Sequence, residues 1–123
     1  MKREITILED DQDIRDICTY LFTSEGYKVN DYGTISAFKQ STTIPDIYLL
    51  DIRLPDGNGL DICHCLKNHP LSANIPVIMM SAHLEESKVR EQCRAEKFIA
   101  KPFHIENLLS QAALLISSHR NQQ

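Results

Sequence analysis

The chain has 123 residues, with 13 basic and 17 acidic side chains and a formal net charge of -4. This length suits one domain with a sizeable core, and 42% hydrophobic with 24% charged residues excludes a disordered or collagen-like chain. The net negative charge argues against a nucleic-acid binder that works mainly by electrostatics. No apolar run approaches the ~20 residues of a membrane span, and the N-terminus lacks a signal-peptide core, so we expect a cytoplasmic protein without membrane contact.

Short apolar segments alternate with longer amphipathic segments along the chain. We expect strands where the short runs are rich in apolar and β-branched residues, at 5–8, 27–30, 47–50, 77–80 and 98–100. Helices are expected where apolar residues recur at helical spacing, at 14–22, 34–40, 59–67, 84–94 and 105–116. Gly26 follows the first of these helices and is expected to end it. We place one domain at 1–118 and a polar tail at 119–123.

The regular alternation of strands and helices predicts the fold class. Strands that are apolar on both faces indicate a parallel sheet that is covered by helices on both sides. Right-handed crossovers then give a doubly wound α/β fold. Such folds bind their ligands at the carboxyl ends of the strands, so the residues at these ends are the candidates for function.

Polar side chains follow four of the five expected strands. They are Glu9, Asp10 and Asp11 after the first strand, Asp51 after the third, Ser81 after the fourth and Lys101 after the fifth. Converging carboxylates repel one another unless they share a cation, and hard oxygen ligands suit Mg²⁺. A lysine and a hydroxyl beside them suit an anionic phosphoryl group. The set therefore predicts phosphoryl transfer to a carboxylate nucleophile.

Four ordered motifs carry a resemblance to a known family. They are ILEDD at 7–11, LLDIRLPDGNG at 49–59, PVIMMSA at 76–82 and KPF at 101–103. Together they resemble the receiver domain of two-component response regulators, over about residues 4–117. The resemblance implies a flavodoxin-like fold: a five-stranded parallel sheet in the order 2-1-3-4-5, with five helices.

The resemblance also implies roles at the phosphorylation site. Asp51 is the expected phosphoacceptor, and Lys101 and Ser81 are expected to contact phosphoryl oxygens. Glu9, Asp10 and Asp51 are expected to hold Mg²⁺ with the backbone carbonyl of Arg53, Asp10 and Asp51 as direct ligands and Glu9 through water. The family usually has a cis peptide bond before the proline at position 102.

Further residues match positions that the family uses to switch state or to set its lifetime. Phe98 occupies the switch position, where it is expected to turn inward when Ser81 moves toward the phosphoryl group. Arg53 and His83 lie two residues after the acceptor and the hydroxyl, at positions that tune the phosphoryl lifetime. Arg94 with Ala95 stands where the family usually has Gly-Ala, so we expect the preceding helix to end differently.

By this resemblance the protein is a phosphorylation-dependent signalling switch rather than an enzyme in the usual sense. The donor would be a sensor histidine kinase or a histidine phosphotransfer protein, and Mg²⁺ the cofactor. Phosphorylation would change the partner-binding face, and the resemblance allows a phosphorylation-dependent homodimer. We expect no direct nucleic-acid binding by this segment.

Other interpretations of the same residues stay open. The acidic run at 9–11 could cap a helix, with Asp11 or Asp13 as the capping residue, and Asp51 alone could cap a loop. The segment 56–59 is most simply a turn, and Ser81 could cap the next helix. The whole chain could be a receiver fold that no longer needs phosphate, or a phosphatase of the haloacid dehalogenase type.

The cysteines offer a weaker alternative. The chain has four of them, at positions 18, 63, 65 and 93. The run Cys63-His64-Cys65, with His69 nearby, suggests a metal site, but zinc sites use wider cysteine spacings. We expect free thiols, buried or half-buried, and solvated histidines.

Overall fold

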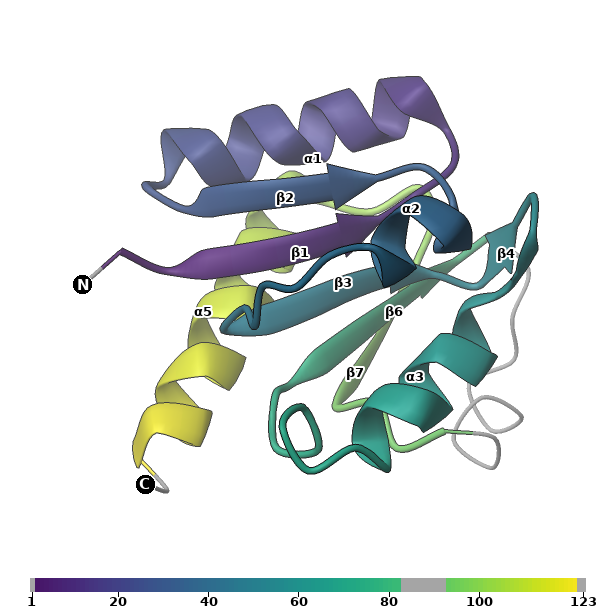
Figure 1. Ribbon diagram of the computed structural model, residues 1–123. Coiled ribbons are helices and arrows are strands. Elements are labelled where there is room, and N and C mark those ends of the chain that lie inside the picture. The colour runs from purple at the N-terminus through teal and green to yellow at the C-terminus, as the bar shows by residue number, and fades with distance from the viewer. Residues whose placement is uncertain (1, 83–92, 122–123) are drawn as a thin grey trace.

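The computed structural model describes residues 2–82 and 93–121. Its main sheet has five parallel strands in the order β2-β1-β3-β6-β7, which confirms the expected fold class and strand order (Figure 1). The strands are β1 (Glu4–Leu8), β2 (Lys28–Tyr32), β3 (Ile47–Asp51), β6 (Val77–Ser81) and β7 (Lys97–Ala100).

Four helices are seen in the described part of the chain. They are α1 (Gln12–Ser24), α2 (Ile35–Lys39), α3 (Gly59–Lys67) and α5 (Ile105–Asn121). The helix expected at 84–94 falls almost wholly on residues outside the described ones. The last helix continues to Asn121, so it enters the segment that we expected to be a polar tail. None of the described helices has the length and apolarity that crossing a membrane requires.

Within the described ranges, each face of the sheet packs against two helices. On one face, Cys18 and Phe22 of α1 and Leu108 of α5 join the inward-facing strand residues in one buried cluster. On the other face, α2 and α3 contribute to a second cluster that includes Ile35 and Leu60. Strands covered on both sides explain why every residue of β3 and β6 is buried and why both are apolar up to their last residue.

Local signals begin and end the helices. Asp11 caps α1, and its Oδ1 accepts a hydrogen bond of 3.1 Å from the Ile14 N–H. After α1, Gly26 adopts φ +88°, a left-handed conformation that suits glycine, and this confirms the expected stop. Arg94 has no such conformation, since no non-glycine residue of the described ranges has positive φ.

The segment after β3 contains a hairpin where we expected only a loop with a turn. β4 (Arg53–Leu54) and β5 (Gly57–Asn58) pair antiparallel. Between them, the Asp56 carboxylate accepts hydrogen bonds from the N–H groups of Ile35 (2.9 Å) and Ser36 (3.0 Å), which hold its pKa below the usual range. The hairpin is thereby joined to the first turn of α2.

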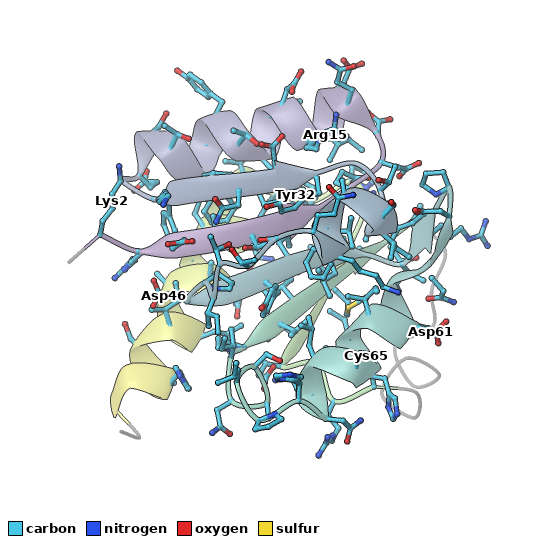
Figure 2. All side chains as sticks on the ribbon, in the orientation of Figure 1. Lys2, Arg15, Tyr32, Asp46, Asp61 and Cys65 are labelled. Atoms are coloured by element: carbon cyan, nitrogen blue, oxygen red, sulfur yellow. The ribbon has the colours of Figure 1, made fainter. Side chains whose placement is uncertain are left out.

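The four cysteines are free thiols, three of them buried. Our expectation was wrong for Cys65, which lies exposed on α3, because the helix turns this position away from the sheet (Figure 2). His64 and His69 are exposed, as expected. Among the described residues, the only cluster of potential metal ligands is made of carboxylates and contains neither cysteine nor histidine.

Candidate functional site at the carboxyl edge of the sheet

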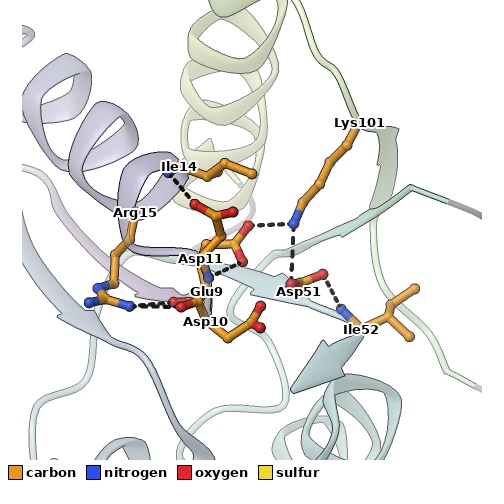
Figure 3. Close-up of polar contacts among 8 residues, drawn as sticks. All are labelled: Glu9, Asp10, Asp11, Ile14, Arg15, Asp51, Ile52 and Lys101. Atoms are coloured by element: carbon orange, nitrogen blue, oxygen red, sulfur yellow. Dashed lines mark hydrogen bonds and ion pairs between the residues drawn. The ribbon is translucent and has the colours of Figure 1, made fainter. Parts of the chain in front are cut away.

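Three of the expected site residues meet at the carboxyl ends of β1, β3 and β7 (Figure 3). Asp51 is the last residue of β3, and Glu9 directly follows β1. β1 and β3 are neighbours in register, with Leu8 opposite Leu50, so the two acids emerge side by side. Lys101 directly follows β7 and reaches across to both of them.

The lysine forms ion pairs with both acids. Lys101 Nζ donates to Glu9 Oε1 and lies 3.1 Å from Asp51 Oδ2. Glu9 is fully buried and Asp51 is 6% exposed. Buried carboxylates need such a partner, because an isolated buried charge is costly. The peptide bond between Lys101 and Pro102 is cis, as the resemblance implied.

Burial and charge shift the pKa values at this site. Burial raises the pKa of Glu9 to about 7, and the neighbouring Asp51 adds to the rise against the opposing effect of Lys101. Burial alone would lower the pKa of Lys101, but its contacts with Glu9 and Asp51 outweigh this and raise it. Glu9 therefore exchanges its proton near neutral pH while Lys101 stays charged.

Carboxylate oxygens from three residues converge here. One oxygen each from Glu9, Asp10 and Asp51 lies within 4.8 Å of the others, and Asp10 is exposed on the open side. With all three ionised, one lysine cannot balance their charge. Hard oxygen donors with one side open to water are the set that Mg²⁺ prefers, so the residues present fit this ion.

Hydrogen bonds fix the positions of the two buried acids. Glu9 Oε2 accepts from the Asp11 N–H at 3.1 Å, and Asp51 Oδ1 accepts from the Ile52 N–H at 2.8 Å. The Arg15 guanidinium donates to the Glu9 carbonyl oxygen at 2.8 Å. Arg15 was not among the residues expected at this site. Its place in the first turn of α1, just after the acidic run, is the signal that could have suggested it.

Gly59 is a second residue whose importance the sequence analysis missed. It begins α3, and a Cβ at this position would lie 1.8 Å from the Asp51 carbonyl oxygen. Its N–H also donates to the Ile52 carbonyl oxygen at 2.7 Å. The turn that we expected at 56–59 thus sets the start of α3 directly against the residue at the end of β3.

A family comparison agrees with this geometry. The model of the response regulator receiver domain matches residues 5–113. The chain belongs to the response regulator receiver family. A receiver domain is a signalling module rather than a classical enzyme, and the Glu9, Asp10 and Asp51 cluster is consistent with the phosphoacceptor site of such a domain. Mg²⁺ is the metal typical of receiver domains, and the family implies a histidine kinase as partner.

Curated relatives and solved structures give the same result. The chain is 34% identical over 116 residues to the phosphate regulon transcriptional regulatory protein PhoB of Escherichia coli, covering 89% of this chain and 50% of that protein. It is 33% identical over 112 residues to the transcriptional regulatory protein KdpE of Staphylococcus aureus, covering 88% of this chain and 47% of that protein. The chain thus spans about half the length of these relatives.

Two solved structures show how closely the fold is shared. A CheY-like response regulator receiver domain protein from Methanospirillum hungatei superposes with a TM-score of 0.88 at 24% identity, covering 100% of both chains. The receiver domain of a signal transduction histidine kinase from Syntrophus aciditrophicus superposes with a TM-score of 0.85 at 27% identity, covering 94% of this chain and 91% of that one.

Two further expected residues, Ser81 and Phe98, lie in β6 and β7, the strands beyond β3 in the sheet. Ser81 is the buried last residue of β6, the strand next to β3, and Phe98 is half-buried in β7 against the cluster under α2 and α3. The Arg53 side chain is exposed in β4. His83 lies outside the described residues.

Proposed function

We propose that Asp51 accepts a phosphoryl group from a phosphohistidine donor, so that the chain works as a phosphorylation-dependent switch. The observation that carries this proposal is the placement of Asp51. Its carboxylate ends a buried strand, 3.1 Å from Lys101 Nζ and beside the oxygens of Glu9 and Asp10. A nucleophilic carboxylate with cationic charge beside it suits in-line attack on phosphorus.

In the transfer, a bond forms between an Asp51 carboxylate oxygen and phosphorus while the bond from phosphorus to the donor imidazole nitrogen breaks. The electron pair of the broken bond stays on the imidazole. Lys101 neutralises negative charge on the phosphoryl oxygens. Glu9, Asp10 and Asp51, with the Arg53 carbonyl oxygen, would hold Mg²⁺, and this ion supplies further positive charge when bound. Holding Mg²⁺ favours the ionised form of Glu9, whose pKa is about 7 without it.

The switch would involve Ser81 and Phe98. We propose that the Ser81 hydroxyl moves to donate a hydrogen bond to a phosphoryl oxygen, and that the Phe98 side chain then turns toward the space that Ser81 has left. Two observations support this. Ser81 ends β6 at the same edge of the sheet as Asp51. Ala100 of β7 pairs with Ser81, and Phe98 lies two residues before Ala100 in the same strand. Movement of this strand pair changes a face that a partner can bind.

The proposed partners follow from the same chemistry. A sensor histidine kinase or a histidine phosphotransfer protein supplies the phosphoryl group. Arg53 and His83, two residues after Asp51 and Ser81 in the sequence, tune its lifetime. A beryllofluoride-activated receiver domain dimer of NtrC4 is a structural neighbour at 21% identity, and we propose that phosphorylation promotes a homodimer here as well.

The proposal is tested by intact-protein mass after incubation with acetyl phosphate or phosphoramidate, with and without Mg²⁺. The wild type should gain one phosphoryl group only with Mg²⁺, and Asp51→Asn should gain none. Asp61→Asn, which removes an exposed acid of α3, is the matched control and should behave like the wild type (Figure 2). No gain in the wild type from either donor, or an equal gain in Asp51→Asn, would contradict the proposal.

A further inference from the structure

A cavity of about 410 Å³ lies away from the acidic cluster, on the face that carries α2 and α3. Part of its wall comes from residues within 41–44 and 69–72, in the connections that lead into β3 and β6, so it lies toward the amino ends of these strands, at the opposite edge of the sheet. Phe38, Ile44, Leu66 and Leu71 give it apolar walls, and Tyr48 of β3 contributes to its lining. Its volume is within the range of about 300–1,000 Å³ that small-molecule sites occupy.

The cavity follows from the shortness of α2. This helix ends at Lys39, after five residues, and residues 41–45 then run to β3 without regular structure. The sheet residues at the base of the cavity are themselves buried, with Tyr48 5% exposed, while the apolar side chains around the opening are not. Ile44 and Leu71 at the opening are 51% and 66% exposed. Large apolar side chains exposed around a hollow are a common feature of binding sites.

The inner part of the cavity holds an unsatisfied polar group. Thr6 of β1 lines the cavity and is 1% exposed, and its hydroxyl has no hydrogen-bond partner among the described residues. A buried hydroxyl without a partner costs free energy, and most such groups in proteins have one. An acceptor on a bound molecule would supply the partner that the protein does not.

The charge around the cavity selects among ligands. Lys39 lies exposed among its lining residues, and no aspartate or glutamate of the described chain lines it. His69, also in the lining, accepts a hydrogen bond at Nδ1 from the Leu71 N–H. An anionic group at the opening is therefore favoured near Lys39, while a buried carboxylate beside Thr6 would lose its hydration without a counter-charge.

We propose that this cavity binds a small aromatic acid. Its ring packs between the apolar walls, a neutral acceptor such as a carbonyl oxygen accepts from the Thr6 hydroxyl, and its carboxylate remains at the opening near Lys39. This site is independent of the phosphorylation chemistry, because it shares no residue with the acidic cluster.

The first test is a titration of the protein with 4-acetylbenzoate, followed by amide chemical shifts. We expect saturable shifts for residues 38–48 and 62–72, with a Kd on the order of 1 mM for a ligand of this size. Two related compounds separate the contribution of the hydrogen-bond acceptor from that of the negative charge. 4-Isopropylbenzoate has the same shape without the acceptor and should bind about fivefold more weakly, and the cation 4-acetylbenzylamine should bind more weakly still.

Three variants complete the experiment. Thr6→Val should lower the affinity for 4-acetylbenzoate to the level of the affinity for 4-isopropylbenzoate. The affinity for 4-isopropylbenzoate and the thermal stability should be unchanged or improved. Ile44→Glu, which places a negative charge at the opening, should weaken both benzoates. Leu114→Glu is the matched control, since Leu114 is 61% exposed on α5, and it should bind like the wild type.

The proposal is overturned by any of four results. The first is the absence of saturable shifts at residues 38–48 and 62–72 with either benzoate. The second is an unchanged affinity for 4-acetylbenzoate in Thr6→Val. The third is equal binding of 4-acetylbenzylamine and 4-acetylbenzoate. Shifts that Leu114→Glu reduces as much as Ile44→Glu would place the binding elsewhere and also overturn it.

Discussion

The buried Glu9 carboxyl makes the stability of the metal-free protein depend on pH. Its pKa is about 7 in the folded protein against an ordinary value of 4.5, mainly because burial disfavours the ionised form. A carboxyl group whose pKa is higher in the folded than in the unfolded protein stabilises the folded state while it is protonated. This stabilisation is fully present below pH 4.5 and is lost as the pH rises through 7. The difference between these two values corresponds to about 3 kcal/mol, since each pKa unit is worth about 1.4 kcal/mol.

Urea unfolding in EDTA, from about pH 5 to about pH 8, measures this loss. The wild type should lose up to about 3 kcal/mol of unfolding free energy over this range. Glu9→Gln, which cannot ionise, should show a much flatter profile, and Asp61→Asn should keep the wild-type slope. Mg²⁺ should restore stability at the upper end, because it binds the ionised site of the folded state. A wild-type profile as flat as that of Glu9→Gln would refute the reasoning.

Three further substitutions test other parts of the structure. Gly59→Ala should lower the unfolding free energy by more than about 2 kcal/mol, because the new Cβ would collide with backbone atoms. In Gly33→Ala the new Cβ would meet only the end of a flexible arginine side chain, so this control variant should lose less stability in the same urea assay. Lys67→Met should cost about 2 kcal/mol by thermal unfolding, because the buried Lys67 Nζ bonds the Ile75 carbonyl oxygen (2.9 Å) and the Glu96 carboxylate (2.7 Å). Asp10→Asn should weaken Mg²⁺ binding about tenfold by calorimetry without loss of stability, because Asp10 is exposed; unchanged Mg²⁺ affinity would remove Asp10 from the ligand set.

Much of the fold and the centre of the site could be predicted because the signals are local. Apolar runs mark the strands, and the residue that follows each run lies at the end of its strand. Parallel pairing then brings Glu9, Asp51 and Lys101 to one edge, whatever the lengths of the connections. The stop at Gly26 and the cap at Asp11 were predictable for the same reason, since each acts on its neighbours in sequence.

The parts that could not be predicted depend on packing between distant segments. Asp56 caps α2 from a hairpin 21 residues away, which no local pattern at Asp56 indicates. Gly59 looked like a turn residue, and its close approach to Asp51 appears only once α3 packs against β3. The cavity beside Thr6 likewise depends on where α2 ends relative to the sheet.

The central claim is that Asp51, among several neighbouring acids, accepts the phosphoryl group. Borohydride reduction of the protein after acetyl phosphate treatment, followed by peptide mass mapping, tests it most directly, because reduction converts an aspartyl phosphate to homoserine. We predict homoserine at position 51, dependent on Mg²⁺ and on phosphate donor, with positions 10 and 11 unchanged. Homoserine at Asp10 or Asp11, or at no aspartate of the phosphorylated protein, would contradict the account.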